Sequence, residues 1–148
     1  MSSVETVNSV LPEAVRDRLA PFGPVFARVS LGLILIPHGY AKLFQDDAIA
    51  ASRNFTGFGW AYPLAWAYAI GALEFFGGLM LVVGLLTRLV ALAFAIEMAV
   101  ISLAVLYPVW TWGKHGMEYS VFMGLIAVSI LMWGGGKYSL DRRLGWNF

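Results

Sequence analysis

The chain has 148 residues, of which 59% are apolar and 13% charged, and its mean hydropathy is +0.73. Soluble domains are about 45–50% apolar and about 25% charged, so this composition excludes an ordinary cytosolic enzyme and a disordered chain. Ten basic residues against nine acidic ones give no basic field for nucleic acid, and the absence of cysteine excludes disulfides, iron–sulfur clusters and thiolate zinc sites. One membrane domain is predicted.

Four apolar runs predict membrane-spanning helices, because each approaches the roughly 20 residues that a crossing needs. They cover residues 24–44, 63–86, 89–107 and 118–133. Only Thr87 and Arg88 separate the second run from the third, so these two helices are expected to form an antiparallel hairpin. The predicted fold is all-α, a four-helix transmembrane bundle. Its expected divisions are an N-terminal cytoplasmic or interfacial segment at 1–23, the transmembrane domain at 24–136 and a cytoplasmic tail at 137–148.

The segments between the spans carry interfacial patterns. Residues 45–62 alternate between polar and aromatic character and predict a short interfacial helix, followed by a loop around Gly57 and Gly59. The tryptophans and glycines of residues 107–116 are typical of a loop at the level of the lipid headgroups. The glycine triplet at 134–136 predicts the end of the last helix.

Lysines and arginines are distributed unequally between the two sides of such a bundle. Seven lie on the side of the termini and the Arg88 turn, and three, Lys42, Arg53 and Lys114, lie on the other. The positive-inside rule then predicts a multi-pass protein of the cell membrane with both termini in the cytoplasm. The first twenty residues contain three acidic side chains and no apolar core, so no cleavable signal peptide is expected.

Two carboxylates lie inside predicted spans, Glu74 at the middle of the second and Glu97 near the middle of the third. A charge at the bilayer centre costs on the order of 2.5–3.5 kcal/mol on insertion scales, so both are expected to face the bundle interior or a wet cavity. Gly71 and Gly78 share a helix face with Glu74 and would let a neighbouring helix approach closely.

The rise of an α-helix, about 1.5 Å per residue, predicts the depth of each polar group below the cytoplasmic end of its helix. His38, Glu74 and Glu118 fall within one turn of each other, with Lys42 just above them. The sequence therefore predicts a polar cluster of these four residues in the outer half of the bundle, with Tyr119 nearby.

Two further residues complete this prediction. Glu97 falls at a lower depth than the cluster, between it and Arg28, so both are expected to be structural charges. Pro37 removes one backbone donor just before His38, and a kink there would turn the imidazole toward the bundle axis.

Structural interpretations of the same residues stay open. Buried His, Lys and Glu side chains can neutralise one another and fix the register of the helices. Lys42 alone can extend to the interface, and Glu118 alone can be a favourable charge at a helix N-terminus. No metal site is predicted, because His38 and His115 are the only histidines, and a bis-histidine haem would need both to point inward at one level.

Several short motifs occur in an order that resembles the DoxX-like membrane proteins. The first helix carries Arg28, His38-Gly39 and Lys42, and the second carries Glu74-Phe75-Phe76-Gly77-Gly78 followed by Gly84-Leu85-Leu86-Thr87-Arg88. The last helix begins with Glu118-Tyr119, and Gly134-x-Gly136-x-Tyr138-Ser139-Leu140-Asp141 closes the pattern. The likeness covers residues 26–144, nearly the whole membrane portion. Glu97 is not part of the family pattern.

The resemblance implies a four-helix integral membrane protein associated with quinone-linked redox chemistry. The family is named for a membrane subunit of a terminal quinol oxidase or thiosulfate:quinone oxidoreductase system, and other members are linked to quinone or catechol stress. On this reading His38, Glu74 and Glu118 are the expected catalytic residues, and Lys42 and Tyr119 complete a headgroup site. The expected cofactor is a non-covalently bound quinone, and the expected partners are the lipid bilayer, a redox subunit that exchanges electrons with the quinone, and a second copy of the chain.

Two other functions remain compatible with the sequence. The protein can be a non-enzymatic scaffold or assembly subunit whose buried charges fix helix packing and partner docking. It can also be a carrier of a small solute or protons, although four short helices without an inverted repeat give that function little support.

Overall fold

The computed structural model describes residues 12–57, 59–111, 114 and 116–146, and every regular element among them is helical. The elements are α1 (Glu13–Leu19), η1 (Ala20–Phe22), α2 (Gly23–Phe44), α3 (Asp47–Gly57), α4 (Pro63–Ala72), η2 (Leu73–Gly77), α5 (Gly78–Val83), α6 (Thr87–Val100), η3 (Ile101–Leu106), α7 (Glu118–Trp133) and α8 (Leu140–Arg143). The all-α class is confirmed for this part of the chain.

Three continuous helical runs are long and apolar enough to cross a membrane. They are Glu13–Phe44, Pro63–Val83 and Thr87–Leu106. Helix α7 is equally apolar but has 16 residues, slightly short of a full crossing. A helix, α3, also occupies the segment where an interfacial helix is predicted. The fourth crossing, the interfacial position of α3 and the orientation of the termini stay predictions.

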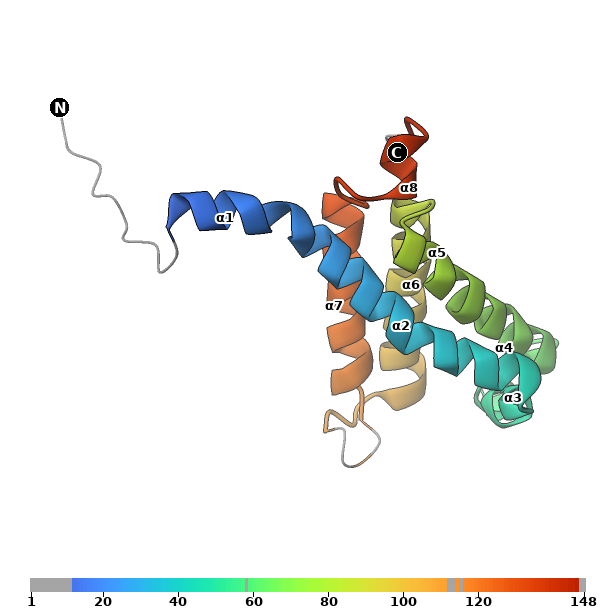
Figure 1. Ribbon diagram of the computed structural model, residues 1–148. Helices are drawn as coiled ribbons and strands as arrows, with labels where there is room; N and C mark the ends of the chain where they lie inside the picture. Colours follow the sequence, from blue (N-terminus) through green and yellow to red (C-terminus); the bar gives the residue numbers. More distant parts are fainter. Residues whose placement is uncertain (1–11, 58, 112–113, 115, 147–148) are drawn as a thin grey trace.

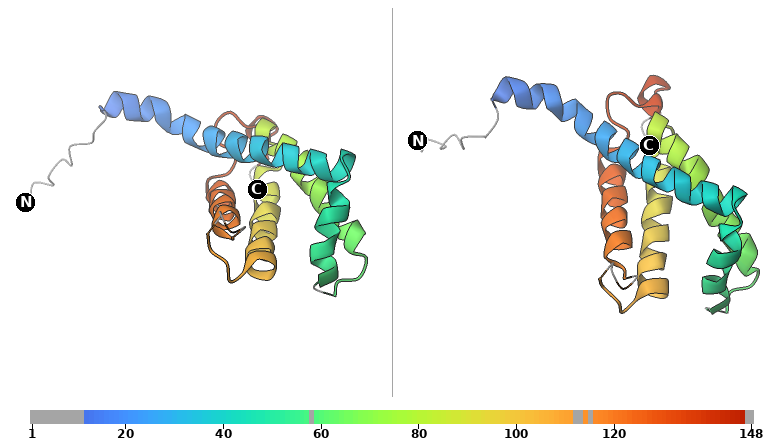
Figure 2. Two further views of the ribbon diagram at one scale, coloured as in Figure 1. Left: turned by 90° about the horizontal axis from the view of Figure 1, so that it is seen from below. Right: turned by 60° about the horizontal axis from the view of Figure 1, so that its bottom comes forward.

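The long helices form two groups joined by α2. Figure 1 shows α2 running obliquely across α6 and α7, which lie side by side. The run from α4 to α5 returns along α2, and the two further views agree that α3 and α4 lie at the far end of α2, away from α7 (Figure 2). The main apolar core lies where the groups meet and includes Leu31, Leu81, Phe94, Met123 and Ala127.

Glycines bring the backbones of α2 and the α4–α5 run into direct contact. A Cβ atom built on Gly39 would lie 2.3 Å from the backbone nitrogen of Phe75, and one on Gly32 would lie 2.5 Å from the carbonyl oxygen of Gly78. No side chain larger than hydrogen fits at such distances. We call Gly32, Gly39, Gly71 and Gly78 the glycine seam, and it fixes how α2 faces the second run.

The last residues fold back onto the bundle and are held there by Arg28. This arginine is 3% exposed and donates hydrogen bonds to the carbonyl oxygens of Leu81, Val82, Gly135 and Tyr138. The guanidinium thus binds carbonyls at the C-terminal end of α5, where Val82 has no backbone donor within the helix and Leu81 also accepts from Gly84. Residues 137–146 are therefore packed against the helices.

Asp141 fastens the same segment to the start of α6. Its carboxylate accepts hydrogen bonds from the backbone N–H groups of Leu86 at 2.6 Å and Thr87 at 2.9 Å, and its own N–H donates to the carbonyl of Gly84. The carboxylate is the N-terminal cap of α6, supplied from the far end of the chain. We call the contacts of Arg28 and Asp141 with these backbones the clasp.

Candidate functional site

Lys42 and Glu74 form a buried ion pair between α2 and η2. Lys42 Nζ lies 2.5 Å from Glu74 Oε2, and Glu74 is 4% exposed. The glycine seam permits the contact, because a Cβ atom on Gly71 would lie 2.8 Å from the Lys42 Cβ. Side chains lean toward the N-terminus of their own helix, so Lys42 extends back along α2 toward the level of Glu74.

A second buried carboxylate, Glu97 of α6, lies next to this pair. It is 6% exposed and interacts electrostatically with both Glu74 and Lys42. Its carboxyl group interacts with that of Glu74, and its oxygens have no other hydrogen-bond partner among the described residues. Glu97 therefore adjoins the Lys42–Glu74 pair, whereas the sequence predicts a depth below it, between the pair and Arg28. We call Lys42, Glu74 and Glu97 the charged triad, which carries two acidic groups and one basic group.

Both acidic residues of the triad adjoin π-helical segments. Glu74 lies within η2, and η3 begins four residues after Glu97 at Ile101. A π-helical turn shifts the following side chains around the helix axis and is frequent at functional sites. Here the two segments flank the same charged triad, although they come from different helices.

A cavity of about 460 Å³ adjoins the charged triad, between α3 and α4 on one side and α6 and η3 on the other. All three triad residues line it, and the rest of its wall is mostly apolar. Three aromatic side chains line it: Phe55, Trp60 and Trp66. The Trp60 ring stacks on Phe55 and meets Trp66 edge to face. We call it the aromatic cavity. Its volume lies in the range of small-molecule sites, which is about 300–1,000 Å³.

The remaining predicted site residues lie on the other side of the Lys42–Glu74 pair. A cavity of about 240 Å³ is lined by His38 and Tyr119 together with Lys42 and Glu74. A third cavity, of about 560 Å³, is lined by His38, Tyr119, Phe122 and Glu118. His38 and Tyr119 are thus shared by both cavities, whereas Glu118 does not reach the one that Glu74 lines.

His38 takes a different orientation from the one predicted. Helix α2 continues through Pro37 to Phe44, and His38 is exposed rather than turned into the core. It makes no hydrogen bond to Glu74. The predicted four-residue cluster is therefore divided: Lys42 and Glu74 are in contact, His38 shares a cavity with them, and Glu118 shares one only with His38.

Arg28 lies apart from this site, in the clasp, with all its recorded hydrogen bonds going to backbone carbonyls. Among the described residues no group of three or more His, Asp and Glu side chains could hold a metal ion. His115, the second histidine, lies outside the described residues.

The aromatic wall of the cavity was not predicted as such: the pattern of Trp60 and Trp66 favours an interfacial belt first and a site for a planar apolar ligand second. Their contribution depends on the packing of α3 against α4 through Ala48, Phe55 and Ala67. One signal was present, since the aromatic segment directly precedes the span that carries Glu74.

The comparison with known families matches residues 23–106 to the DoxX family model. The chain belongs to the DoxX family. The matched range includes all three triad residues of this DoxX protein but neither Glu118 nor the closing segment with Asp141.

Two curated relatives extend the likeness. The uncharacterized membrane protein Rv3486 of Mycobacterium tuberculosis is 30% identical over 138 residues, covering 84% of this chain and 82% of that protein. A Bacillus subtilis protein named "Putative oxidoreductase CatD" is 29% identical over 121 residues, covering 80% of this chain and 84% of its own length. No solved structure is significantly similar to this chain.

Proposed function

We propose that this DoxX protein binds the headgroup of a membrane quinol in the aromatic cavity, as the membrane subunit of a quinone-linked oxidoreductase. The observation that supports the proposal most directly is the charged triad at the wall of an otherwise apolar, aromatic cavity. A ligand for such a site needs a flat apolar ring and a few polar groups at its edge. The name of the Bacillus subtilis relative agrees with a redox role.

The acceptors of the triad favour the reduced form of the ligand. Lys42 already donates to Glu74, whereas the oxygens of Glu97 have no hydrogen-bond partner other than the Glu74 carboxyl group among the described residues. A quinol carries two O–H donors and can give one to Glu97, whereas a quinone has none to give. The aromatic side chains Phe55 and Trp66 would flank the ring, since aromatic pairs stack or meet edge to face.

Oxidation of a quinol to a quinone releases two protons and two electrons. Glu97 and Glu74 are placed to accept the protons, which is general-base chemistry. His38, Tyr119 and Glu118 line the two cavities beyond Glu74 and would pass protons on toward the surface. The two electrons would go to a redox centre on a partner subunit, such as a flavin, haem or copper protein.

A binding measurement tests this proposal. The full chain in mild detergent is titrated with a short-chain benzoquinol without oxygen, and binding is followed by tryptophan fluorescence. We expect Glu97→Gln to weaken quinol binding about tenfold to a hundredfold, because a buried group that loses its hydrogen-bond partner costs about 1–3 kcal/mol. Asp47→Asn, an exposed residue of α3, is the matched control. Equal affinities of Glu97→Gln and the unchanged chain would overturn the proposal.

Two alanine-to-phenylalanine substitutions, one inside the cavity and one outside it, give a second and independent test. Ala93 of α6 lines the aromatic cavity, whereas Ala99 of the same helix is exposed. We expect Ala93→Phe to abolish quinol binding by occupying the space of the ring, and Ala99→Phe to leave it unchanged. Binding that survives in both variants would place the ligand elsewhere.

The scaffold function is the second candidate, and the buried Lys42–Glu74 pair favours it. Such a pair can fix one arrangement of helices without taking part in chemistry. In a scaffold, Glu74→Gln would lower the folding yield or the co-purification of partner subunits, and the assembled complex would turn over normally. A quinone-linked subunit would instead assemble and lose turnover. Proton or solute flux in reconstituted vesicles would identify a carrier.

A further inference from the structure

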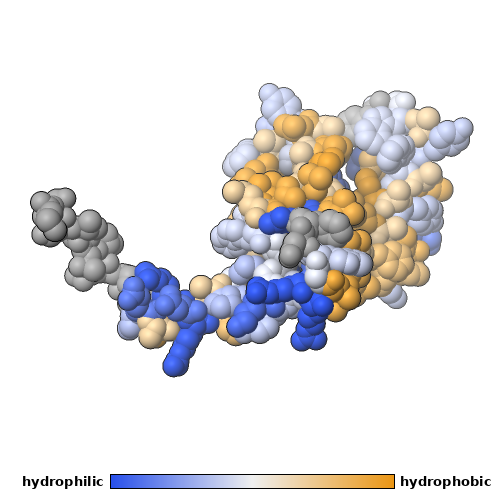
Figure 3. Space-filling model, turned by 90° about the horizontal axis from the view of Figure 1, so that it is seen from above, coloured by the Kyte–Doolittle hydropathy of each residue, from blue (hydrophilic) through white to orange (hydrophobic). Residues whose placement is uncertain are grey.

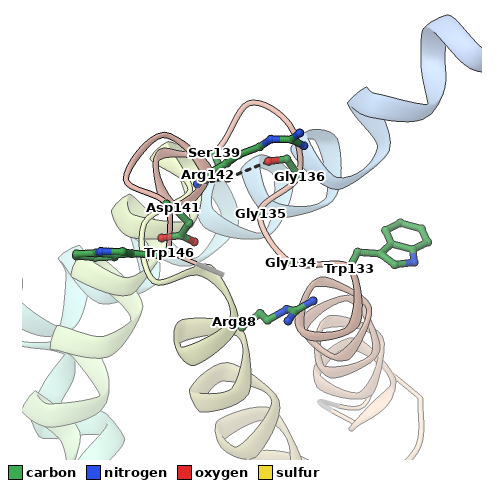
Figure 4. Close-up of a pocket in the computed structure, with 10 residues that line it drawn as sticks. Arg88, Trp133, Gly134, Gly135, Gly136, Ser139, Asp141, Arg142 and Trp146 are labelled. Atoms are coloured by element: carbon green, nitrogen blue, oxygen red, sulfur yellow. Dashed lines mark hydrogen bonds between the residues drawn. The ribbon is translucent and has the colours of Figure 1, made fainter. Parts of the chain in front are cut away.

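A pocket of about 500 Å³ lies at the clasp end of the molecule, away from the charged triad. It is formed by the start of α6, the end of α7 and the C-terminal segment (Figure 4). Its cationic side chains are Arg88 and Arg142, and the indoles of Trp133 and Trp146 also contribute to the wall. The proposed quinol site uses none of these residues.

Arg88 is held in place by the end of α7. Its guanidinium donates a hydrogen bond to the carbonyl oxygen of Met132 at 3.3 Å. It also lies against Gly134, where an added Cβ would be 3.2 Å from the Arg88 Nε. Gly134 has a φ of +74°, so glycine at this position serves both the backbone conformation and the close approach of the arginine. Figure 4 shows the guanidinium beneath the glycine segment.

Arg142 supplies the second positive charge from α8. Its backbone N–H donates to the Ser139 hydroxyl, whereas its guanidinium makes no hydrogen bond or ion pair within the described residues. Figure 4 shows this side chain extended beside Gly136. A guanidinium offers five N–H donors in a planar fork that matches the oxygens of a phosphate.

The acidic residue in the pocket does not cancel these charges. Asp141 also lines the pocket, but its carboxylate accepts hydrogen bonds from Leu86 and Thr87 and lies in the field of Arg28. Its negative charge is thus already balanced by the N-terminus of α6 and the clasp arginine. Among the described residues, the Arg142 guanidinium is therefore a positive charge at the pocket that no acidic side chain pairs.

The pocket lies at the depth where phospholipid headgroups are expected. It is at the ends of the apolar helices α6 and α7, and Trp133 and Trp146 are 63% and 43% exposed there. Exposed indoles at the end of an apolar helix are typical of the membrane interface. Figure 3 shows the molecule from this end, where hydrophilic residues lie next to hydrophobic ones.

We propose that Arg88 and Arg142 form a binding site for a phosphate group at the clasp end, of the kind carried by the headgroup of an anionic phospholipid. Basic pockets at the ends of transmembrane helices bind anionic headgroups in this way. The arginines hold the phosphate oxygens, the glycine segment lets the headgroup approach the backbone, and the indoles contact the region of the glycerol. A lipid bound there would join α6, α7 and the C-terminal segment from outside.

The test measures retention of phospholipid by the full chain. Protein in mild detergent is offered equal amounts of phosphatidylglycerol and phosphatidylcholine, and the bound lipids are counted by native mass spectrometry. We expect phosphatidylglycerol to be retained at least fivefold better, and Arg142→Gln to remove this preference. Arg142→Gln breaks no side-chain hydrogen bond or ion pair within the described residues, so loss of folding would not explain the result. Arg143→Gln is the matched control, because Arg143 is the next residue in the chain and does not line the pocket.

A second arm separates the two sources of the phosphate group. Thermal unfolding is followed with inorganic phosphate in place of lipid. Stabilisation by inorganic phosphate that Arg142→Gln abolishes supports the site and assigns it to a soluble phosphate. A preference for phosphatidylglycerol without that stabilisation supports the site and assigns it to lipid. The proposal is overturned when neither probe responds, or when Arg143→Gln and Arg142→Gln behave alike.

Discussion

Four ionisable side chains are buried in the described part of the chain, and they differ in the groups that they bind. Arg28 and Asp141 bind backbone groups, and Glu74 binds Lys42. Glu97 is the exception, because it is buried beside another acid and has no hydrogen-bond partner other than that acid among the described residues. Burying a carboxyl group without a full set of hydrogen-bond partners is costly and is rarely retained for architecture alone. At the scale of single residues, Glu97 is therefore the strongest candidate for binding a ligand.

Arg28→Gln tests the structural role of the clasp. The glutamine leaves several of the carbonyls of Leu81, Val82, Gly135 and Tyr138 without a donor, at about 1–3 kcal/mol for each buried group. We expect a loss of at least about 3 kcal/mol, measured as a lower midpoint of unfolding in detergent. Arg18→Gln, exposed on α1, serves as the control and should unfold like the unchanged chain. A midpoint unaffected by Arg28→Gln would contradict the clasp.

The residues of the candidate site could be predicted only in part from the sequence. Glu74 and Lys42 were predicted to lie close together from their depths along the helices, and the structure pairs them. Glu118 was grouped with them by depth alone. The pairing of Ser102 in η3 with Ser120 in α7 shows that Glu118 lies about two residues beyond the level of Ser102, well above Glu97. Depth along separate helices does not give lateral distance, and the oblique path of α2 is not encoded in any one segment.

At the scale of elements, the predicted helix limits agree with the observed ones to within a few residues, whereas the depth of Glu97 was misjudged. The cause is the turn before α6. Helix α5 ends at Val83, where Gly84 takes a φ of +75°, so Glu74 lies nine residues, about 14 Å, from that end. Glu97 lies ten residues, about 15 Å, from the start of α6 at Thr87. Counting the turn as helix had placed the two acids at different levels. The π-helical segments were also not predictable, because they satisfy tertiary packing rather than a local pattern.

The glycine seam makes a prediction about elements. Gly39→Ala would put a Cβ within 2.3 Å of the Phe75 backbone, so α2 must move away from η2. We expect a destabilisation of a few kcal/mol and a weaker Lys42–Glu74 contact, measured by unfolding in detergent and by the affinity for the quinol. Gly23→Ala, in the same helix but with nothing within 4 Å of the added Cβ, should be neutral or slightly stabilising. Equal effects of the two substitutions would show that the backbones are not in contact.

At the scale of the whole molecule, the number of crossings and the orientation remain to be measured. The chain has no cysteine, so single cysteines can be introduced without background. We expect a cysteine at Arg18 or at Lys137 to react with a membrane-impermeant maleimide only after the cells are opened. A cysteine at Lys114 should react in intact cells. Labelling of Lys114→Cys and Lys137→Cys from the same side would mean that α7 does not cross the membrane.

The clasp has a consequence for the order in which the protein is completed. Arg28 emerges from the ribosome early, whereas two of its four acceptors, Gly135 and Tyr138, are synthesised about a hundred residues later. Until then the first helix carries a charge whose final partners do not yet exist, and α6 lacks the carboxylate that caps it. The clasp therefore cannot form until Asp141 has been synthesised. The bundle is thus fastened by a segment that is synthesised after all the long helices, so a chain cut before Gly135 would lack Asp141 and two of the four acceptors of Arg28.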